Sequence, residues 1–197
     1  MPYTDRVIYP DRVVVDWSAS GDREFPDWPS PVLLISVENQ GVCAWGVPLA
    51  GQNPPVLVGG QIVSRTGWSH GTTQYCPDVA AFVASRRWDA ACLSQEPLIQ
   101  AQAAELDAGS LEYLRERYEQ GPVTVGWPGH TVHRFQCRDA KIMLWDSPGQ
   151  CDWWISAVGA SALDETIAAV WHLSDLRTSL WSSDSQGAAL LRRLRGH

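Results

Sequence analysis

The sequence contains the stretch Val32-Leu-Leu-Ile-Ser-Val-Glu-Asn-Gln-Gly-Val-Cys-Ala-Trp-Gly-Val47, in which two apolar runs flank a short polar segment. Residues 32–37 and 42–47 carry the β-branched and aromatic side chains that favour strands. The polar segment ends in glycine, which readily adopts the positive φ that a tight hairpin loop requires. The stretch therefore predicts two adjacent antiparallel strands.

The residues that follow this hairpin favour loops and then helices. Residues 39–77 contain one charged side chain and many Gly, Pro, Ser and Thr residues, which predicts a loop with short strands at 56–58 and 61–64. Proline is favoured in the first turn of a helix. We therefore expect helices to open at Pro77 and at Pro97.

The second half of the chain predicts an amphipathic helix and then a meander. Apolar residues three and four positions apart predict a helix over 111–118 that ends before Gly121-Pro122. Four strand-like segments follow, separated by turn residues: 122–127, 130–137, 141–145 and 151–158. Ser161 and Ser185 are then expected to cap two further helices.

The order of these elements indicates an α+β fold with a mainly antiparallel sheet, made of the hairpin and the later meander and packed with several helices. The length of 197 residues suits a single domain. Within it, we expect residues 1–30 to form an irregular extension of strand and loop, and residues 175–197 to form a C-terminal helix. Arginines in the last turn of that helix would complement its dipole.

Composition excludes several classes of function. The formal net charge is −7, and an acidic chain is a poor candidate for binding phosphate backbones, so no nucleic acid is expected. No apolar run approaches the roughly 20 residues that cross a bilayer, and the N-terminus lacks a signal-peptide pattern. Five cysteines form no disulfide framework, which favours a cytoplasmic chain with reduced thiols. The acidic balance favours a basic protein partner, with a merely solubilising surface as the alternative.

Neither metal binding nor catalysis is indicated by the spacing of reactive residues. His130 and His133 lie in an expected strand, where residues three apart point to opposite faces and cannot bind one ion together. The least improbable pair for cysteine catalysis is His70 with Cys76. We therefore expect no catalytic residues, no metal and no cofactor.

The eleven tryptophans predict a core rich in aromatic side chains. Trp153 and Trp154 are adjacent in an expected strand, so they must face opposite sides. We expect Trp45, Trp145 and Trp171 to occupy core positions. The alternative is an aromatic box for a cationic ligand.

The residues from Val37 to Val47, the following Asn53-Pro-Pro-Val56 and a loop with Trp68 that leads to Asp78-Val-Ala-Ala-Phe82 resemble the bacterial branch of the SUKH superfamily. This superfamily includes Smi/Knr-type cell-wall synthesis regulators and many immunity proteins of bacterial toxin systems. The resemblance extends over about residues 31–171, and its specific part is 38–56. It implies a compact α+β fold without catalytic residues and with a protein-binding surface. The motif residues, with a mainly structural role, are Glu38, Asn39, Gln40, Gly41, Trp45, Pro54 and Pro55.

The leading hypothesis is a cytoplasmic immunity protein that neutralises a cognate toxin by forming a stoichiometric complex. Acidic side chains of the expected helix and its end, Glu112, Glu116 and Glu119, are the candidate contacts to a basic toxin. An adaptor of the same fold, which regulates or assembles a housekeeping complex, is the alternative. The third hypothesis is a hydrolase that depends on cysteine or histidine. The oligomeric state stays open.

Overall fold

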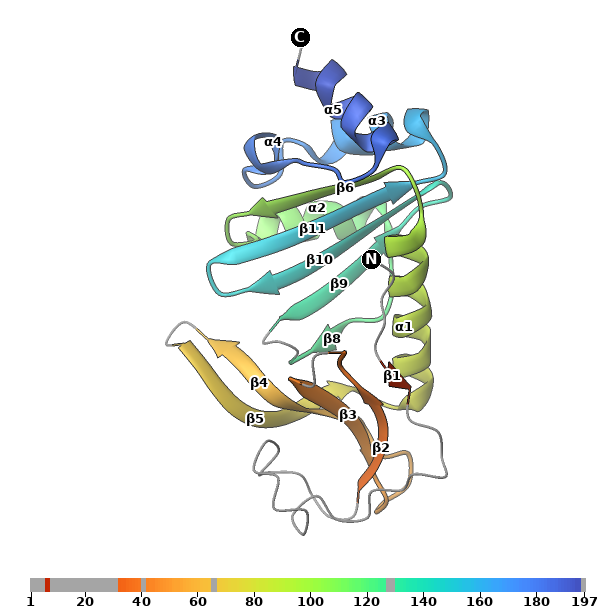
Figure 1. Cartoon of the computed structure of the whole chain (residues 1–197), viewed down its shortest axis with the longest axis vertical. Coiled ribbons are helices and arrows are strands. Elements are labelled where there is room, and N and C mark those ends of the chain that lie inside the picture. Colours follow the sequence, from red (N-terminus) through yellow and green to blue (C-terminus); the bar gives the residue numbers. More distant parts are fainter. Residues whose placement is uncertain (1–5, 8–31, 40–41, 65–66, 127–129, 196–197) are drawn as a thin grey trace. The chain divides into compact units, whose positions relative to one another are not determined.

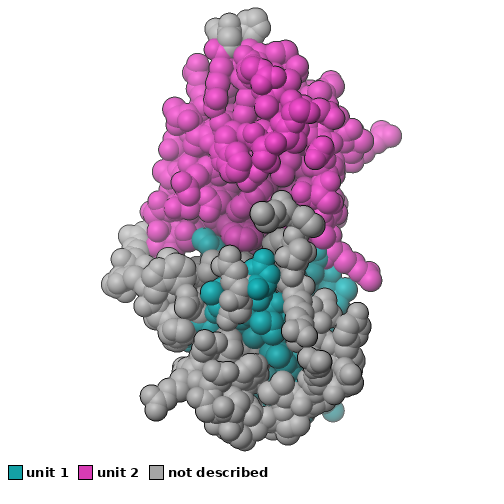
Figure 2. Space-filling model, in the orientation of Figure 1, with its two compact units in different colours: residues 1, 3–86, 124–131 teal, residues 2, 87–123, 132–197 magenta. Residues whose placement is uncertain are grey.

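The computed structural model describes residues 6–7, 32–39, 42–64, 67–126 and 130–195 (Figure 1). Contacts within the chain group it into two compact units, which Figure 2 colours separately. Unit 1 contains residues 3–86 and 124–131, and unit 2 contains residues 87–123 and 132–197. Helices and antiparallel sheets are both present, so the α+β prediction is confirmed. That the chain is one domain stays a prediction.

Unit 1 contains an antiparallel sheet of five strands in chain order. These strands are β1 (Arg6–Val7), β2 (Val32–Val37), β3 (Cys43–Pro48), β4 (Val56–Ser64) and β5 (Gly67–Cys76). The short strand β8 (Thr124–Val125) belongs to the same unit. The predicted hairpin is confirmed, because β2 pairs with β3 in antiparallel register, with Leu33 opposite Val47 and Val37 opposite Ala44.

The core of unit 1 is built around three aromatic rings. Trp45 is fully buried, and its ring centroid lies 5.8 Å from Tyr75 and 6.3 Å from Phe82. Phe82 lies on α1 (Val79–Ser94), which begins in this unit. Asp78 caps that helix, since its Oδ1 accepts a hydrogen bond from the Ala81 amide at 2.7 Å. The sheet and the start of α1 therefore share one apolar cluster.

The antiparallel sheet of unit 2 has the strand order β6-β11-β10-β9-β7, with the predicted meander at its centre. Its strands are β6 (Leu98–Ala103), β7 (Glu119–Gln120), β9 (Thr131–Gln136), β10 (Ala140–Ser147) and β11 (Gln150–Ala157). The residue pairing is continuous along β10 and β11, from Ala140 opposite Ala157 to Ser147 opposite Gln150. Thus the expected strands at 130–137, 141–145 and 151–158 are confirmed.

The two faces of this sheet have different cover. One face packs against four helices: α2 (Ala108–Arg117), α3 (Ala160–Val170), α4 (Leu176–Ser179) and α5 (Ser185–Arg195). Trp153 and Ile155 of β11 are fully buried on that side, together with Leu114 of α2. On the opposite face, the second half of α1 contributes Cys92 to a smaller cluster with Val132 and Met143.

Two of the predictions made from the sequence are wrong. Residues 67–76 form the ten-residue strand β5 and not a loop, because β4 offers a complete antiparallel edge over their length. The residues after Pro97 form β6 and not a helix, since Leu98 to Ala103 pair with β11. In both places long-range pairing overrides local composition.

Three helix termini also differ from the expected ones. The helix α2 ends at Arg117, so Glu119 lies in the strand β7. Ser161 lies inside α3, whose N-cap is Gly159, and it bonds Glu165 instead. The Asp184 side chain caps α5 by accepting a hydrogen bond from the Gly187 amide, so the expected capping by Ser185 is wrong. Residues 175–197 contain α4 and α5 where one helix was expected.

In the described part of the chain, no helix is both long and apolar enough to cross a membrane. Of the expected N-terminal extension, 1–30, only Arg6–Val7 is described, and it pairs with β2. The other residues of this extension lie outside the described residues.

Candidate functional site

Glu38 of the sequence motif has a role inside the hairpin. It is 9% exposed; its amide donates a hydrogen bond to the Cys43 carbonyl at 3.0 Å, and its Oε2 accepts one from the Val42 amide at 3.5 Å. Asn39 lies exposed in the turn. Gln40 and Gly41, including the expected positive φ of the glycine, lie outside the described residues. The carboxylate of Glu38 thus holds the hairpin loop.

The remaining motif residues also lie in the frame of unit 1. Trp45 occupies the centre of its core, as expected, and Arg86 lies 5.0 Å over the Trp45 ring. Pro54 and Pro55 are half-buried just before β4. These positions suit residues that shape the sheet.

The three candidate acidic contacts are exposed, and they lie among positive and polar side chains. Glu112 and Glu116 lie on α2, and Glu119 lies on β7. Glu116 accepts a hydrogen bond from Arg117 at 3.4 Å, and Glu119 accepts one from Gln136 at 3.2 Å. The surface of α2 is therefore of mixed charge.

The buried cysteines Cys76, Cys92 and Cys151 are poorly suited to nucleophilic catalysis. Burial raises the pKa of the Cys92 thiol to about 12, and burial also raises the pKa of Cys151. Both groups stay protonated thiols at neutral pH, whereas the thiolate is the nucleophile. Cys76 is 3% exposed and donates to the Asp78 carbonyl at 3.3 Å. The side chain of its expected partner, His70, lies outside the described residues.

The two histidines considered as metal ligands, His130 and His133, lie near the start of β9. His133 is buried within that strand, while His130 precedes it and is half-buried. Among the described residues, no group of three or more His, Cys, Asp or Glu side chains is placed to hold a metal ion.

A site that sequence reasoning missed lies on the face of the unit 2 sheet that α1 covers only in part. The register places Trp154 of β11 between Met143 of β10 and Gln100 of β6, and Gln100 in turn forms a bridge with Trp181. Residues directly opposite in a sheet project from the same face. These four side chains therefore form one row across the sheet.

A second row lies two residues along the strands. Asp152 of β11 lies between Trp145 of β10 and Gln102 of β6. The rings of Trp145 and Trp154 lie 4.8 Å apart at an angle of 52°. We call the surface formed by Trp145, Trp154, Trp181, Asp152, Gln100 and Gln102 the aromatic–acid face.

Asp152 is the single carboxylate of this face and is half-buried. Its Oδ1 and Oδ2 accept hydrogen bonds from the Gln150 side-chain amide at 3.1 and 3.0 Å. A cavity of about 330 Å³ adjoins it, lined by Gln100, Gln102, Asp152, Trp154 and Trp181 among others. The face therefore combines one negative charge, two neutral amides and aromatic rings.

Trp181 reaches this face because the segment before α5 is bound along the outer edge of β6. The amides and carbonyls of Gln100 and Trp181 exchange two hydrogen bonds, at 2.8 and 2.7 Å. Ser182 donates to the Leu98 carbonyl at 2.7 Å, and Asp184 accepts from the Leu98 amide at 2.9 Å. This segment, residues 180–184, is called the edge strap. Without such a strap, the unpaired N–H and C=O groups of an edge strand can pair with another chain and promote aggregation.

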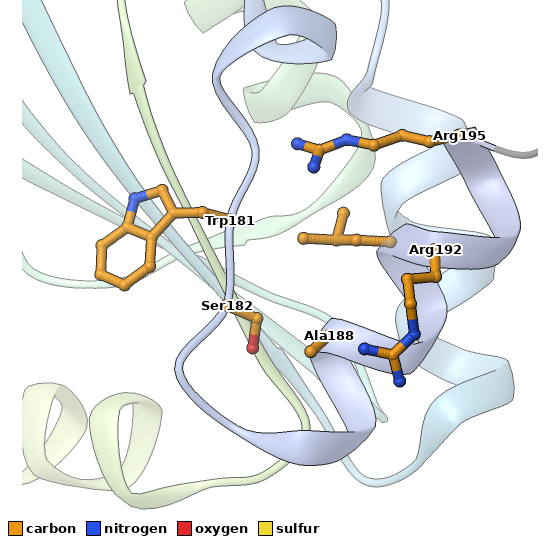
Figure 3. A pocket seen from close by; sticks show the side chains of 6 residues that line it. Trp181, Ser182, Ala188, Arg192 and Arg195 are labelled. Atoms are coloured by element: carbon orange, nitrogen blue, oxygen red, sulfur yellow. The ribbon is translucent and has the colours of Figure 1, made fainter.

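Trp181 is 49% exposed, and its indole extends away from the arginine side chains of α5 (Figure 3). Between α5 and the edge strap lies a second cavity, of about 530 Å³, lined by Ser182, Ala188, Leu191, Arg192 and Arg195 among others. Arg195 donates a hydrogen bond to the Leu180 carbonyl. The arginines expected to complement the helix dipole do lie in the last turn, and one of them also fixes the strap.

Part of the aromatic–acid face could be anticipated from the sequence. The opposite orientation of Trp153 and Trp154 is confirmed, because Trp153 is fully buried and Trp154 is half-buried on the other face. Trp145 and Trp171 are half-buried and not core residues as expected, since their sides of the sheet and helix are incompletely covered. The alternation of Gln150, Asp152 and Trp154 is the signal that marks a polar, aromatic face.

The chain matches no protein-family model, and comparisons with curated proteins and with solved structures found no match.

Proposed function

We propose that the chain is a non-enzymatic immunity protein that neutralises a cognate toxin in the bacterial cytoplasm by forming a stoichiometric complex. The supporting observation is the arrangement of residues 38–56, the part of the sequence that resembles SUKH proteins. The described residues of this stretch, 38–39 and 42–56, form the end of the hairpin, the buried strand around Trp45 and the approach to β4. They therefore serve the frame of unit 1 and leave surfaces elsewhere for a partner.

The charge of the chain supports a basic partner. A net charge of −7 attracts positively charged proteins over a distance of about one Debye length, roughly 8–10 Å at physiological salt. Glu112, Glu116 and Glu119 contribute to this field from an exposed surface, although Arg115 and Arg117 lie among them. Such charges chiefly accelerate association and select the partner.

Co-expression tests the proposal. The product of the adjacent gene is expressed in a host cell with and without this chain, and the two proteins are then analysed together by gel filtration. We expect the adjacent product to arrest growth alone, growth to recover with this chain, and the two to elute as one complex. Unchanged survival together with separate elution would overturn the proposal.

The chemical state of the toxin and the amount of this protein needed for rescue distinguish binding from catalysis. Mass spectrometry of the toxin recovered from the complex is expected to give an unmodified chain, and rescue is expected to require at least equimolar amounts of this protein. Rescue at a small fraction of the toxin concentration would contradict stoichiometric neutralisation and favour an enzyme. Rescue without complex formation would favour an indirect, regulatory role.

A further inference from the structure

We infer that the aromatic–acid face of unit 2 binds an arginine side chain of a basic protein partner. This inference deepens the proposed function, on which it rests for the nature of the partner. The chemistry of the face itself follows from Asp152 and the tryptophans around it, all of which lie in unit 2.

The carboxylate of Asp152 has room for a cationic partner. Gln150 occupies it with a neutral amide, and a carboxylate can accept about four hydrogen bonds. Within the described residues, no arginine or lysine forms an ion pair with Asp152. A guanidinium can bind such a group through two parallel hydrogen bonds, which are stronger than those to a neutral donor.

The tryptophans supply a second attraction for the same group. The face of an indole ring is electron-rich and attracts a cation within about 6 Å of its centroid. Two other partly exposed rings of unit 2 are paired in this way, because Arg177 lies 4.8 Å over Trp171 and Arg117 lies 3.7 Å over Tyr113. Over the described part of the chain, the rings of Trp154 and Trp181 have no such cation.

Arginine suits the face better than lysine does. Its planar guanidinium can stack on an indole and bond a carboxylate in the same plane, whereas an ammonium group is a compact and strongly hydrated charge. The cavity of about 330 Å³ lies at the lower end of the range for ligand sites, so it suits one side chain and not an extended ligand. Gln100 and Gln102 add amide groups for the neighbouring backbone.

Charge argues against the other polymers that stack on tryptophan. Asp152 would repel a phosphate backbone, and the net charge of −7 adds to that repulsion. A neutral oligosaccharide could donate hydroxyl hydrogen bonds to the carboxylate, but it carries no charge to neutralise it. A basic protein is the occupant that uses both the aromatic rings and the charge.

A peptide titration tests the site without the toxin. The full-length protein, labelled with nitrogen-15, is titrated with acetyl-Gly-Arg-Gly-amide while the indole N–H signals of Trp154 and Trp181 are followed by NMR. The matched ligand carries citrulline, which has the shape of arginine without its charge. The protein variants are Asp152→Asn and Trp181→Leu, with Asp164→Asn, an exposed change on α3, as the control.

We expect the arginine peptide to shift both indole signals with a millimolar dissociation constant, and the citrulline peptide to bind at least about tenfold more weakly. Asp152→Asn and Trp181→Leu are each expected to weaken arginine binding about tenfold, and Asp164→Asn to leave it unchanged. The inference would be overturned if the arginine peptide gave no response, or if the citrulline or lysine peptide bound as tightly as the arginine peptide. A stronger response to cellotetraose would overturn it as well.

A second measurement separates this inference from the proposed function. The complex with the adjacent gene product is measured for the wild type and for Asp152→Asn, and we expect the dissociation constant to rise at least about tenfold. A tight complex that is indifferent to Asp152→Asn would overturn the arginine site and leave the immunity function intact. Absence of a complex, together with charge-dependent peptide binding, would overturn the immunity function and retain the chemistry of the site.

Discussion

Arg134 is a fully buried arginine on β9 of the unit 2 sheet. Its Nε and Nη2 donate to the two carboxylate oxygens of Asp89 at 2.6 and 2.8 Å, and its Nη1 donates to the Pro122 carbonyl at 2.8 Å. The side chains of Arg134 and Asp89 are 0% and 6% exposed. A buried charge of this kind is tolerated because its partner and its hydrogen bonds replace water.

Removing the charge of Asp89 is therefore expected to destabilise unit 2 strongly. Asp89→Asn keeps the shape of the side chain and leaves the guanidinium buried without a counter-charge, so the free energy of unfolding should fall by about 3–5 kcal/mol. Urea denaturation measures this change. The exposed pair of Glu116 and Arg117 is the matched control, and Glu116→Gln should change the stability by less than about 0.5 kcal/mol. Equal effects of the two variants would refute the argument.

His133 gives the stability of the protein a dependence on pH. Burial, with the positive charges of Arg115 and Arg134 as smaller causes, lowers its pKa from 6.5 to about 4. Because the folded state holds the imidazole neutral, stability from this group is present above pH 6.5 and is lost as the pH falls toward 4. The loss amounts to about 3 kcal/mol. Urea denaturation between pH 7 and 4 should show a smaller loss for His133→Phe than for the wild type, and equal losses would contradict this assignment.

At the scale of elements, the local sequence predicted the strands that are marked by a run of apolar residues and bounded by turn residues. The hairpin of β2 and β3 could be read from its apolar runs, and the meander from its turn residues. Strand β5 could not, because its glycines disfavour a strand, which forms here through pairing with β4. Strand β6 was obscured by Pro97, which suits the first position of a strand as well as that of a helix.

The edge strap depends on a glycine in the first turn of α5. At Gly187 an added Cβ would meet the Ser182 hydroxyl, the Leu98 carbonyl at 2.7 Å and the Asp184 Oδ2 at 2.9 Å. Alanine normally stabilises a helix by up to about 1 kcal/mol relative to glycine. Here Gly187→Ala should instead destabilise unit 2 by about 1–3 kcal/mol, since the strap must move away from β6.

Hydrogen exchange measures the movement of the strap directly. The Leu98 amide is bonded to Asp184 and the Gln100 amide to Trp181, so both should exchange faster in Gly187→Ala. Gln186→Ala, an exposed change in the same turn, should leave both amides protected. Protection of these amides in both variants would mean that the turn accommodates a Cβ, and the proposed dependence would be abandoned.

At the scale of the whole molecule, the candidate site assembles residues that no local pattern connects. Trp181 follows α4, while Gln100 lies on β6, and only the pairing of the edge strap brings them together. Trp145 and Asp152 are brought together by the register of β10 and β11. The sequence could indicate that Trp154 faces away from the core, but it could not indicate what lies beside it. In contrast, the acids of α2 could be chosen from helical spacing alone.

Net charge and the aromatic–acid face should act on different steps of partner binding. Long-range attraction to a chain of charge −7 affects the encounter, so the association rate constant should fall about tenfold as salt is raised from about 20 to 150 mM.

The triple variant Glu112→Gln, Glu116→Gln, Glu119→Gln should lower that rate constant and change dissociation little, because these side chains stay exposed. Asp152→Asn should chiefly accelerate dissociation, since its carboxylate would contact the bound cation. Stopped-flow and surface-plasmon measurements of the two variants separate the effects, and a triple variant that acts mainly on dissociation would contradict the division between steering and contact.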